Sequence, residues 1–183
     1  MKRFLWPFAQ SYPLSVYKIW LENDGHPMPR SYLHRLHTCR PRGSHVILWA
    51  SQVETKTLLE KHHSQFPVIH DLFWAPHTSA VMRSDILRLL LIYDRGGLYS
   101  DHDAKWKRKR LSFPHDFIAW TEFVHTDEGV RNNMHMTREH RGDRPEYNVR
   151  IGNYAFWSQK PESRILARCL NRVQERMSRN AHA

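Results

Sequence analysis

The feature that most constrains the fold of this chain is an apolar helical pattern that ends at two glycines and passes at once into a short strand. From about Ser79 to Asp94, apolar residues recur at spacings of three and four and so share one predicted buried stripe, namely Met82, Ile86, Leu89, Leu90 and Tyr93. Thr78 or Ser79 supplies an N-cap, and Gly96-Gly97 is typical of a helix C-terminus. Leu98-Tyr99-Ser100 then has the composition of a strand.

Strand-like and helix-like segments also alternate along the rest of the chain. Further strands are expected at residues 16–20, 45–49, 117–120 and 149–157, and further helices at 53–65, ended by Pro67, and at 162–177, after Pro161. This alternation favours an α/β fold. The length of 183 residues fits a single domain over 1–183, with an N-terminal arm at 1–14 and a long polar loop at 126–146.

Two classes of protein are excluded at this stage. No segment approaches the ~20 consecutive apolar residues of a membrane-spanning helix. The longest candidate, Ile86–Tyr93, is interrupted by Arg88, and the apolar stretch after Met1 is short and broken by Pro7. Cys39 and Cys169 lie far apart, so we expect buried free thiols in a reducing compartment rather than a disulfide framework.

The net charge is +10, from 28 Lys and Arg against 18 Asp and Glu, and it predicts attraction to polyanions. The charge fits three kinds of anionic partner equally well: nucleic acid, an anionic membrane surface and a phosphorylated substrate. Residues 105–110 form a basic run around Trp106, which as a nucleic-acid site would offer one stacking platform. The last predicted helix carries a basic stripe that could lie on a membrane: Arg164, Arg168, Arg172 and Arg176.

Histidine pairs suggest a different enzyme class. His62-His63 and His115-Asp116 are the kinds of dyad that a metal-dependent phosphohydrolase uses, although neither has a partner set at helical spacing. This class and a basic nucleic-acid-binding module are the two alternatives to the function considered next.

An acidic pair follows the glycine turn. Asp101 and Asp103 are two apart, so in an extended segment both carboxylates face one side and His102 faces the other. Paired carboxylates suit Mg²⁺ or Mn²⁺, although a solvated turn explains an isolated pair equally well. Asp85 and Arg88 are three apart on one helix face, where the simplest interpretation is an exposed ion pair.

Taken together, residues 83–103 resemble a known signature. The run combines Ser-Asp-x-x-Arg, Tyr-x-x-Gly-Gly-x-Tyr and Asp-x-Asp at fixed spacing, and it is similar to the core of the DXD sugar-binding glycosyltransferases. That family includes relatives of yeast initiating mannosyltransferases, bacterial capsule and lipopolysaccharide glycosyltransferases, and the catalytic domain of the large clostridial glucosylating toxins. Weaker similarities flank the run at 16–20, 151–156 and 161–163.

The resemblance implies a fold and a set of site residues. The fold would be of GT-A type, a Rossmann-like α/β/α sandwich with a mixed, mostly parallel sheet. Asp103 would ligate a cation directly, and Asp101 would bind ribose or sugar and reach the cation directly or through water. Asp85 and Arg88 would grip the donor sugar, and these four are the expected catalytic residues. Further donor-binding positions are Ile19, Trp20, Ser84, Tyr99 and Asn153.

The resemblance also implies the reaction. A hexose would pass from a nucleotide sugar, with a UDP-sugar favoured, to a saccharide or lipid-linked acceptor, with retention of configuration and with Mn²⁺ or Mg²⁺ as cofactor. The glycan would be a polysaccharide, lipopolysaccharide or capsule. We expect a cytoplasmic protein in peripheral contact with the inner face of an anionic membrane, and no nucleic-acid partner.

Overall fold

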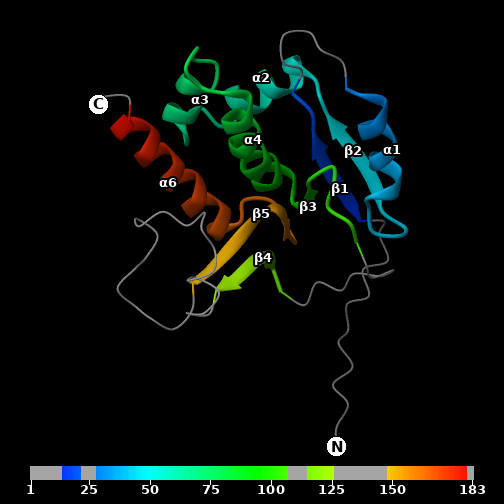
Figure 1. Cartoon of the computed structure of the whole chain (residues 1–183). Coiled ribbons are helices and arrows are strands. Elements are labelled where there is room, and N and C mark those ends of the chain that lie inside the picture. Colours follow the sequence, from blue (N-terminus) through cyan, green and yellow to red (C-terminus); the bar gives the residue numbers. More distant parts are fainter. Residues whose placement is uncertain (1–13, 22–27, 107–114, 126–147, 181–183) are drawn as a thin grey trace, which may run out of the picture.

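The computed structural model describes residues 14–21, 28–106, 115–125 and 148–180 (Figure 1). The predicted arm at 1–14 and the polar loop at 126–146 lie outside these ranges, except for Leu14. In chain order the elements are β1 (Ser15–Ile19), α1 (Arg30–Thr38), β2 (His45–Trp49), α2 (Gln52–Lys61), α3 (Pro67–Phe73), α4 (Ala80–Arg95), β3 (Gly97–Ser100), β4 (Phe117–His125), β5 (Asn148–Ser158) and α6 (Arg164–Asn180).

The strands form one five-stranded sheet in the order β2-β1-β3-β5-β4. β1 pairs in parallel with β2 and with β3, whereas β5 pairs antiparallel with both β3 and β4. Four of the five strands therefore run in one direction and β5 runs against them. The predicted α/β class and the mixed, mostly parallel sheet are confirmed.

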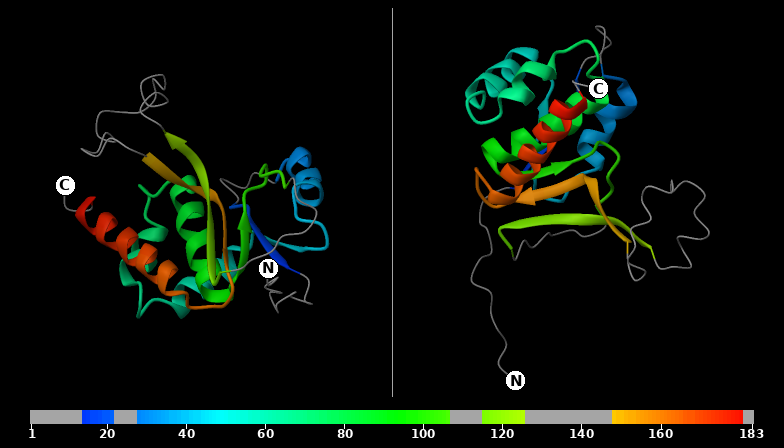
Figure 2. Two further views of the ribbon diagram at one scale, coloured as in Figure 1. Left: turned by 90° about the horizontal axis from the view of Figure 1, so that it is seen from below. Right: turned by 90° about the vertical axis from the view of Figure 1, so that its left-hand side faces the viewer.

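The main core lies between one face of the sheet and the helices. Tyr17, Tyr99 and Phe156 are in register across β1, β3 and β5, and their side chains join the apolar residues of α2, α3, α4 and α6. Figure 2 shows α4 and α6 on the same side of β4 and β5. Because successive strand residues point to opposite faces, this register places one aromatic layer directly under the helices.

The opposite face of the sheet holds a second, smaller cluster. Val16, Leu98 and Trp157 are buried there, again in register, and Trp106 and Trp120 pack against them. The rings of Trp106 and Trp120 meet edge to face with centroids 5.3 Å apart. Trp106 is therefore partly buried against this face of the sheet, whereas the rest of the basic run, residues 107–110, lies outside the described residues.

Helix α4 begins and ends as its sequence predicts. The Ser79 hydroxyl accepts a hydrogen bond from the Met82 N–H at 3.2 Å, and Gly96 and Gly97 both adopt positive φ. The single buried stripe was too narrow a prediction. Met82 is 44 % exposed, whereas three additional apolar side chains are buried because α4 packs against the sheet on one side and against α2 and α6 on others: Leu87, Leu91 and Ile92.

Two helices, α1 and α3, were not predicted from the sequence. α1 buries Leu36 alone, so it has no apolar stripe that a period could reveal. Pro67 does not end a helix but occupies the first turn of α3, where its missing N–H costs nothing. The expectation of two buried thiols was half correct, because Cys39 is buried and Cys169 is exposed. None of the helices in the described ranges has the length and apolar character needed to cross a bilayer.

The turn between α4 and β3 generates a stability prediction. Gly97 has φ +89°, and a Cβ there would lie 3.0 Å from Cε2 of Tyr17 and 3.2 Å from the Ser15 carbonyl oxygen. Gly43 has φ +79° with open space around it, so it is a matched control. Gly43→Ala should cost about 1 kcal/mol for left-handed backbone, and Gly97→Ala should cost roughly 1–3 kcal/mol more for overpacking. Chemical unfolding of both variants measures the difference, and equal losses would contradict it.

Candidate functional site

The candidate site lies where the chain reverses its direction of travel across the sheet. From β1 the chain passes to β2 on one side and then returns, through α2, α3 and α4, to β3 on the other side. The carboxyl ends of the parallel strands β1 and β3 therefore meet at a topological switch point. Open α/β sheets bind their ligands in the crevice at such a point.

A cavity of about 550 Å³ opens at this switch point. Its walls come from residues that follow β1, from Tyr32 of α1, from the first turns of α4 and from the turn after β3. Among them are most of the residues expected from the sequence: Ile19, Trp20, Ser84, Arg88, Tyr99, Asp101 and Asp103.

Arg88 is the centre of the charged network beside the cavity. Its guanidinium contacts the Asp101 carboxylate at 3.2 Å and the Asp85 carboxylate at 3.0 Å, and it donates to the Asn153 carbonyl oxygen at 2.7 Å. It also lies over the Tyr99 ring, 4.7 Å from the centroid. Because Arg88 is only 8 % exposed, Asp85 and Arg88 are not a simple surface ion pair.

Asp85 and Asn153 join this network without lining the cavity. Asn153 projects from β5, and its amide donates to Asp85 Oδ1 at 2.9 Å. Asp85 in turn contacts Arg88, so this hydrogen bond connects β5 to the charged network. The sequence predicted both residues at the donor site. They lie in its charged network but do not line the cavity.

Asp101 is held from several sides. The Tyr99 hydroxyl donates to Asp101 Oδ1 at 2.5 Å, and Arg88 contacts the same oxygen. Oδ2 makes no hydrogen bond to the described residues and remains available to a ligand. Burial raises the pKa of the Asp101 carboxyl and the nearby Asp103 adds to this, while Arg88 and Tyr99 oppose it without cancelling it.

Asp103 differs from Asp101 in its surroundings. Its side chain is exposed at the cavity and forms no hydrogen bond or ion pair with the described residues. One unengaged carboxylate at Asp103 and one unengaged oxygen at Asp101 form a donor set of hard oxygens. A hard divalent cation such as Mg²⁺ or Mn²⁺ fits such a set, because it keeps its remaining positions for water and substrate phosphates.

The orientation predicted for His102 was wrong. The strand ends at Ser100, and the Ala104 N–H bonds to the Asp101 carbonyl oxygen at 3.2 Å, so Asp101 to Ala104 form a turn rather than an extended segment. The alternation of sides does not apply there, and His102 lines the same cavity as both aspartates.

His102 lines the cavity and keeps one ring nitrogen without a partner among the described residues. Its Nε2–H donates to the Ile19 carbonyl oxygen at 2.9 Å, which leaves Nδ1 as the ring acceptor in the neutral form. Burial lowers the pKa of His102 and so favours that neutral form. Nδ1 is buried with no partner among the described residues.

Three aromatic rings cluster on the wall opposite α4. Trp20 lies 5.2 Å from Tyr32 and 6.0 Å from His102 between centroids, and Tyr32 lies 5.6 Å from His102. Trp20 Nε1 is buried and, within the described ranges, has no partner. Tyr32 was not predicted as a site residue because helix α1 was not predicted. The only signal in the sequence was an aromatic residue between Pro29 and the basic Arg35.

Lys18 was also not predicted as a residue of the site. It is fully buried on the second face of the sheet, and its ammonium donates to the carbonyl oxygens of Asp101 at 2.7 Å and Ser100 at 3.4 Å. Burial lowers its pKa to about 8. A lysine between apolar residues in the middle of a buried strand was the available signal. Lys18 fixes the backbone of the turn that carries both aspartates.

The histidine dyads do not assemble into a phosphohydrolase site in the described residues. His62 is buried and bonded to Asp94 at 2.8 Å, and Lys61 donates to the same oxygen at 2.6 Å. These hydrogen bonds lower the pKa of Asp94, although burial alone would raise it. His115 and Asp116 are exposed before β4.

The comparisons with known proteins agree with this geometry. Residues 30–119 match the family model described as a glycosyltransferase sugar-binding region containing the DXD motif. The matched residues run from α1 to the first residues of β4 and contain Asp85, Arg88, Asp101 and Asp103, whereas Trp20 and Asn153 lie outside them. No curated protein matches the chain.

Lys18 generates a prediction about stability and pH. Its pKa is about 8 in the folded chain against 10.5 for an ordinary lysine, so between these values the unfolded chain holds more protons. Unfolding therefore takes up a proton in this range, so raising the pH disfavours unfolding and stabilises the fold, by up to roughly 1.4 kcal/mol per pH unit. Below pH 8 both states are protonated and this group contributes no pH dependence.

The measurement compares the parent with Lys18→Met by denaturant unfolding from pH 7.5 to 10.5. The free energy of unfolding of the parent should rise relative to that of Lys18→Met as the pH rises. Lys56→Met removes an exposed lysine that pairs with Glu60, and it should follow the parent. Parallel curves for the parent and Lys18→Met would contradict the prediction.

Proposed function

We propose that this chain is a glycosyltransferase that transfers a hexose from a nucleotide sugar, a UDP-sugar first, to a saccharide or lipid-linked acceptor, because residues 30–119 belong to the DXD-motif glycosyltransferase sugar-binding family. The observation that carries the proposal is the buried side chain of Arg88, which joins Asp85, Asp101 and Asn153 beside a cavity at the switch point. Retention of configuration, and a place in polysaccharide, lipopolysaccharide or capsule synthesis, are carried over from the resemblance as parts of the proposal.

In this proposal the donor spans the cavity from the aromatic wall to α4. The base packs against Trp20 and Tyr32, whose rings lie 5.2 Å apart between centroids. The sugar hydroxyls meet Ser84, Arg88 and Asp101 at the other end. A cavity bounded by aromatic rings on one side and by charged side chains on the other suits a ligand with one flat aromatic end and one hydroxyl-rich end.

Asp103 and Oδ2 of Asp101 would hold the divalent cation, Mn²⁺ or Mg²⁺. When bound, that cation supplies Lewis-acid stabilisation of the charge on the nucleoside diphosphate leaving group. Lys18 holds the carbonyl oxygens of the turn, and Tyr99 and Arg88 hold Oδ1 of Asp101, so the carboxylates are placed before any ligand arrives.

A thermal-shift experiment tests donor binding. Mn²⁺ with a UDP-hexose should raise the melting temperature of the parent, because a ligand that binds only the folded state stabilises it by mass action. Asp103→Asn should abolish this shift, since it removes the exposed carboxylate of the pair. A GDP-hexose series run beside the UDP series identifies the nucleotide.

Asp116→Asn is the matched control for this experiment. It neutralises another exposed aspartate, before β4, and should leave the shift unchanged. The proposal is wrong if no UDP- or GDP-sugar shifts the parent with either metal, or if Asp103→Asn shifts as much as the parent does.

A second cavity is the proposed acceptor site. It has a volume of about 500 Å³ and lies between β5 and α6, with Asn153 at one side. Its floor is apolar, from Leu89, Phe117, Phe156, Leu166 and Val173, and three arginines of α6 stand along it: Arg168, Arg172 and Arg176. An apolar groove lined by arginines complements an amphiphile with an anionic head, which supports a lipid-linked phosphate as acceptor.

This acceptor site also explains the proposed location at a membrane. Arg164, Arg168, Arg172 and Arg176 are all exposed, so α6 presents the basic stripe expected from its sequence. A peripheral contact of this stripe with an anionic inner leaflet would bring a lipid-linked acceptor to the groove beside Asn153. In this proposal the net charge of +10 favours binding to phosphate groups and to the membrane surface rather than to nucleic acid.

Arginine variants of α6 test the acceptor site. Arg168→Ala with Arg176→Ala should raise the KM for a lipid-phosphate acceptor about tenfold, equivalent to one lost charge-assisted contact of about 1.4 kcal/mol. Slow hydrolysis of the donor by water should not change, because the donor cavity is untouched. Arg42→Ala removes an exposed arginine before β2, outside both the groove and the stripe, and should behave like the parent. An unchanged KM in the double variant would contradict this assignment.

A further inference from the structure

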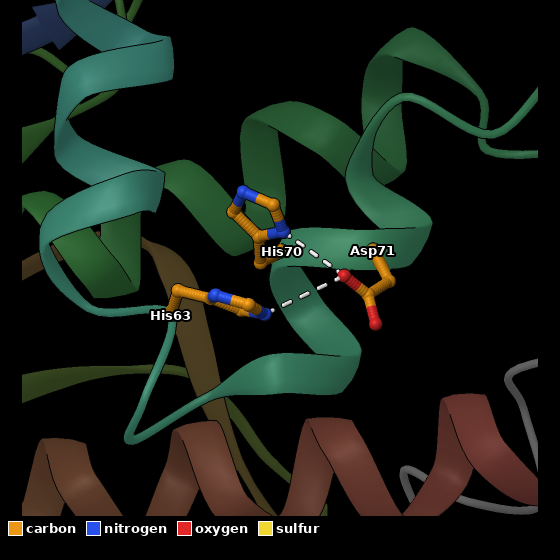
Figure 3. A group of neighbouring side chains, drawn as sticks. All are labelled: His63, His70 and Asp71. Carbon is orange, nitrogen blue, oxygen red and sulfur yellow. Dashed lines mark hydrogen bonds and ion pairs between the residues drawn. The ribbon is translucent and has the colours of Figure 1, made fainter.

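A cluster of two histidines and one aspartate lies away from the switch-point cavity, at the corner between α2 and α3. His63 sits in the turn after α2, and His70 and Asp71 follow each other on α3. Figure 3 shows the two rings and the carboxylate pointing toward one another from these two segments. None of the three lines the switch-point cavity or the groove of α6.

The distances within the cluster fit a tetrahedral metal ion. Donors that bind Zn²⁺ at 2.0–2.1 Å stand about 3.3 Å apart. His70 Nδ1 lies 3.0 Å and His63 Nε2 lies 3.7 Å from Asp71 Oδ1, and all three ligating atoms lie within 4.8 Å of one another. The two distances to Asp71 Oδ1 lie on either side of this tetrahedral separation.

The corner that carries the cluster is rigid. His62 is buried against Asp94, and its ring packs on Phe66 and Tyr93, which fixes the neighbouring His63 on the outer side of the turn. The Phe66 N–H bonds to the His62 carbonyl oxygen at 2.8 Å, so the turn closes before Pro67 begins α3. The backbone positions of the donors are thus set without a metal.

The chemistry of the donors separates this cluster from the paired aspartates. Imidazole nitrogens suit Zn²⁺, Co²⁺, Ni²⁺ and Cu²⁺, whereas two carboxylates alone suit Mg²⁺ and Mn²⁺. Three protein ligands leave the fourth tetrahedral position to water or to an external group. His63 and Asp71 are exposed and His70 is half-buried, so an ion reaches the cluster directly from solvent.

We propose that His63, His70 and Asp71 form a binding site for a zinc-type transition metal, separate from the glycosyltransferase site. The bound ion would link the end of α2 to α3. Since the Val68 N–H bonds to Gln174 Oε1 of α6 at 3.0 Å, the linked corner is also connected to the last helix. The proposal does not depend on the donor or acceptor of the transfer reaction.

The test uses Co²⁺ as a coloured probe in the full chain after treatment with a chelator. The Asp103→Asn variant serves as the background, so that the paired aspartates do not contribute. Titration should produce the visible absorption of tetrahedral Co²⁺ with one ion per chain, and Zn²⁺ should displace it while Mg²⁺ should not. Zn²⁺ should also raise the melting temperature of this background.

His63→Ala and Asp71→Asn, added singly, should each weaken binding by at least about tenfold, since even outer-shell partners of a metal change affinity by about 10–100-fold. His77→Ala removes another exposed histidine, between α3 and α4, and should bind like the background. Unfolding curves recorded with chelator confirm that each variant folds, and both His63 and Asp71 are exposed enough for this to be expected. Absence of Co²⁺ absorption, or equal affinity in all variants, overturns the proposal and leaves Asp71 as a hydrogen-bond acceptor for two surface histidines.

Discussion

The structure around the cavity depends on one buried cation. Arg88 leaves α4 inside the protein, where an unpaired guanidinium would be very costly, and its partners come from three separate segments: Asp85 of its own helix, Asp101 after β3 and the Asn153 carbonyl oxygen of β5. The same side chain covers the Tyr99 ring. A change in the position of any one of these segments would take away one of the partners of this buried charge. The helix, the turn and the antiparallel strand are therefore placed relative to one another by electrostatics as well as by apolar packing.

A second cation acts on the same turn from the other face of the sheet. Arg88 reaches the Asp101 carboxylate on the side of α4, whereas Lys18 reaches the Asp101 carbonyl oxygen from within β1. Two positive charges thus flank a backbone segment that carries two carboxylates close together, and this offsets the repulsion between them. The net charge of +10 does not predict this arrangement, because part of it comes from the exposed arginines of α6, which lie outside the cavity.

The sequence was informative where a local rule acts on consecutive residues. The cap at Ser79, the two glycines and the strand at 97–100 follow from such rules, and they position Asp101 and Arg88 correctly. The sequence did not predict the features that are determined by tertiary contacts. The side on which His102 lies depends on a turn that begins directly after Ser100, where alternation assumes an extended segment through Asp103, and α1 has no periodic apolar stripe because only Leu36 is buried. The role of Lys18 depends on a carbonyl oxygen 83 residues away, and no pattern within β1 encodes that distance.

The two glycines between α4 and β3 have a consequence for the length of this segment. Gly96 ends the helix and Gly97 already pairs with β5, so no residue is free between the last turn of α4 and the first pair of the ladder. Arg88 and Asp101 are thereby joined by a fixed stretch of helix, turn and strand. One extra residue in β3 would send Tyr99 to the opposite face of the sheet, and one extra residue in α4 would rotate Arg88 about 100° around the helix axis. Substitution can vary the chemistry of this site, but insertion or deletion within residues 88–101 would separate the arginine from the aspartate that it holds.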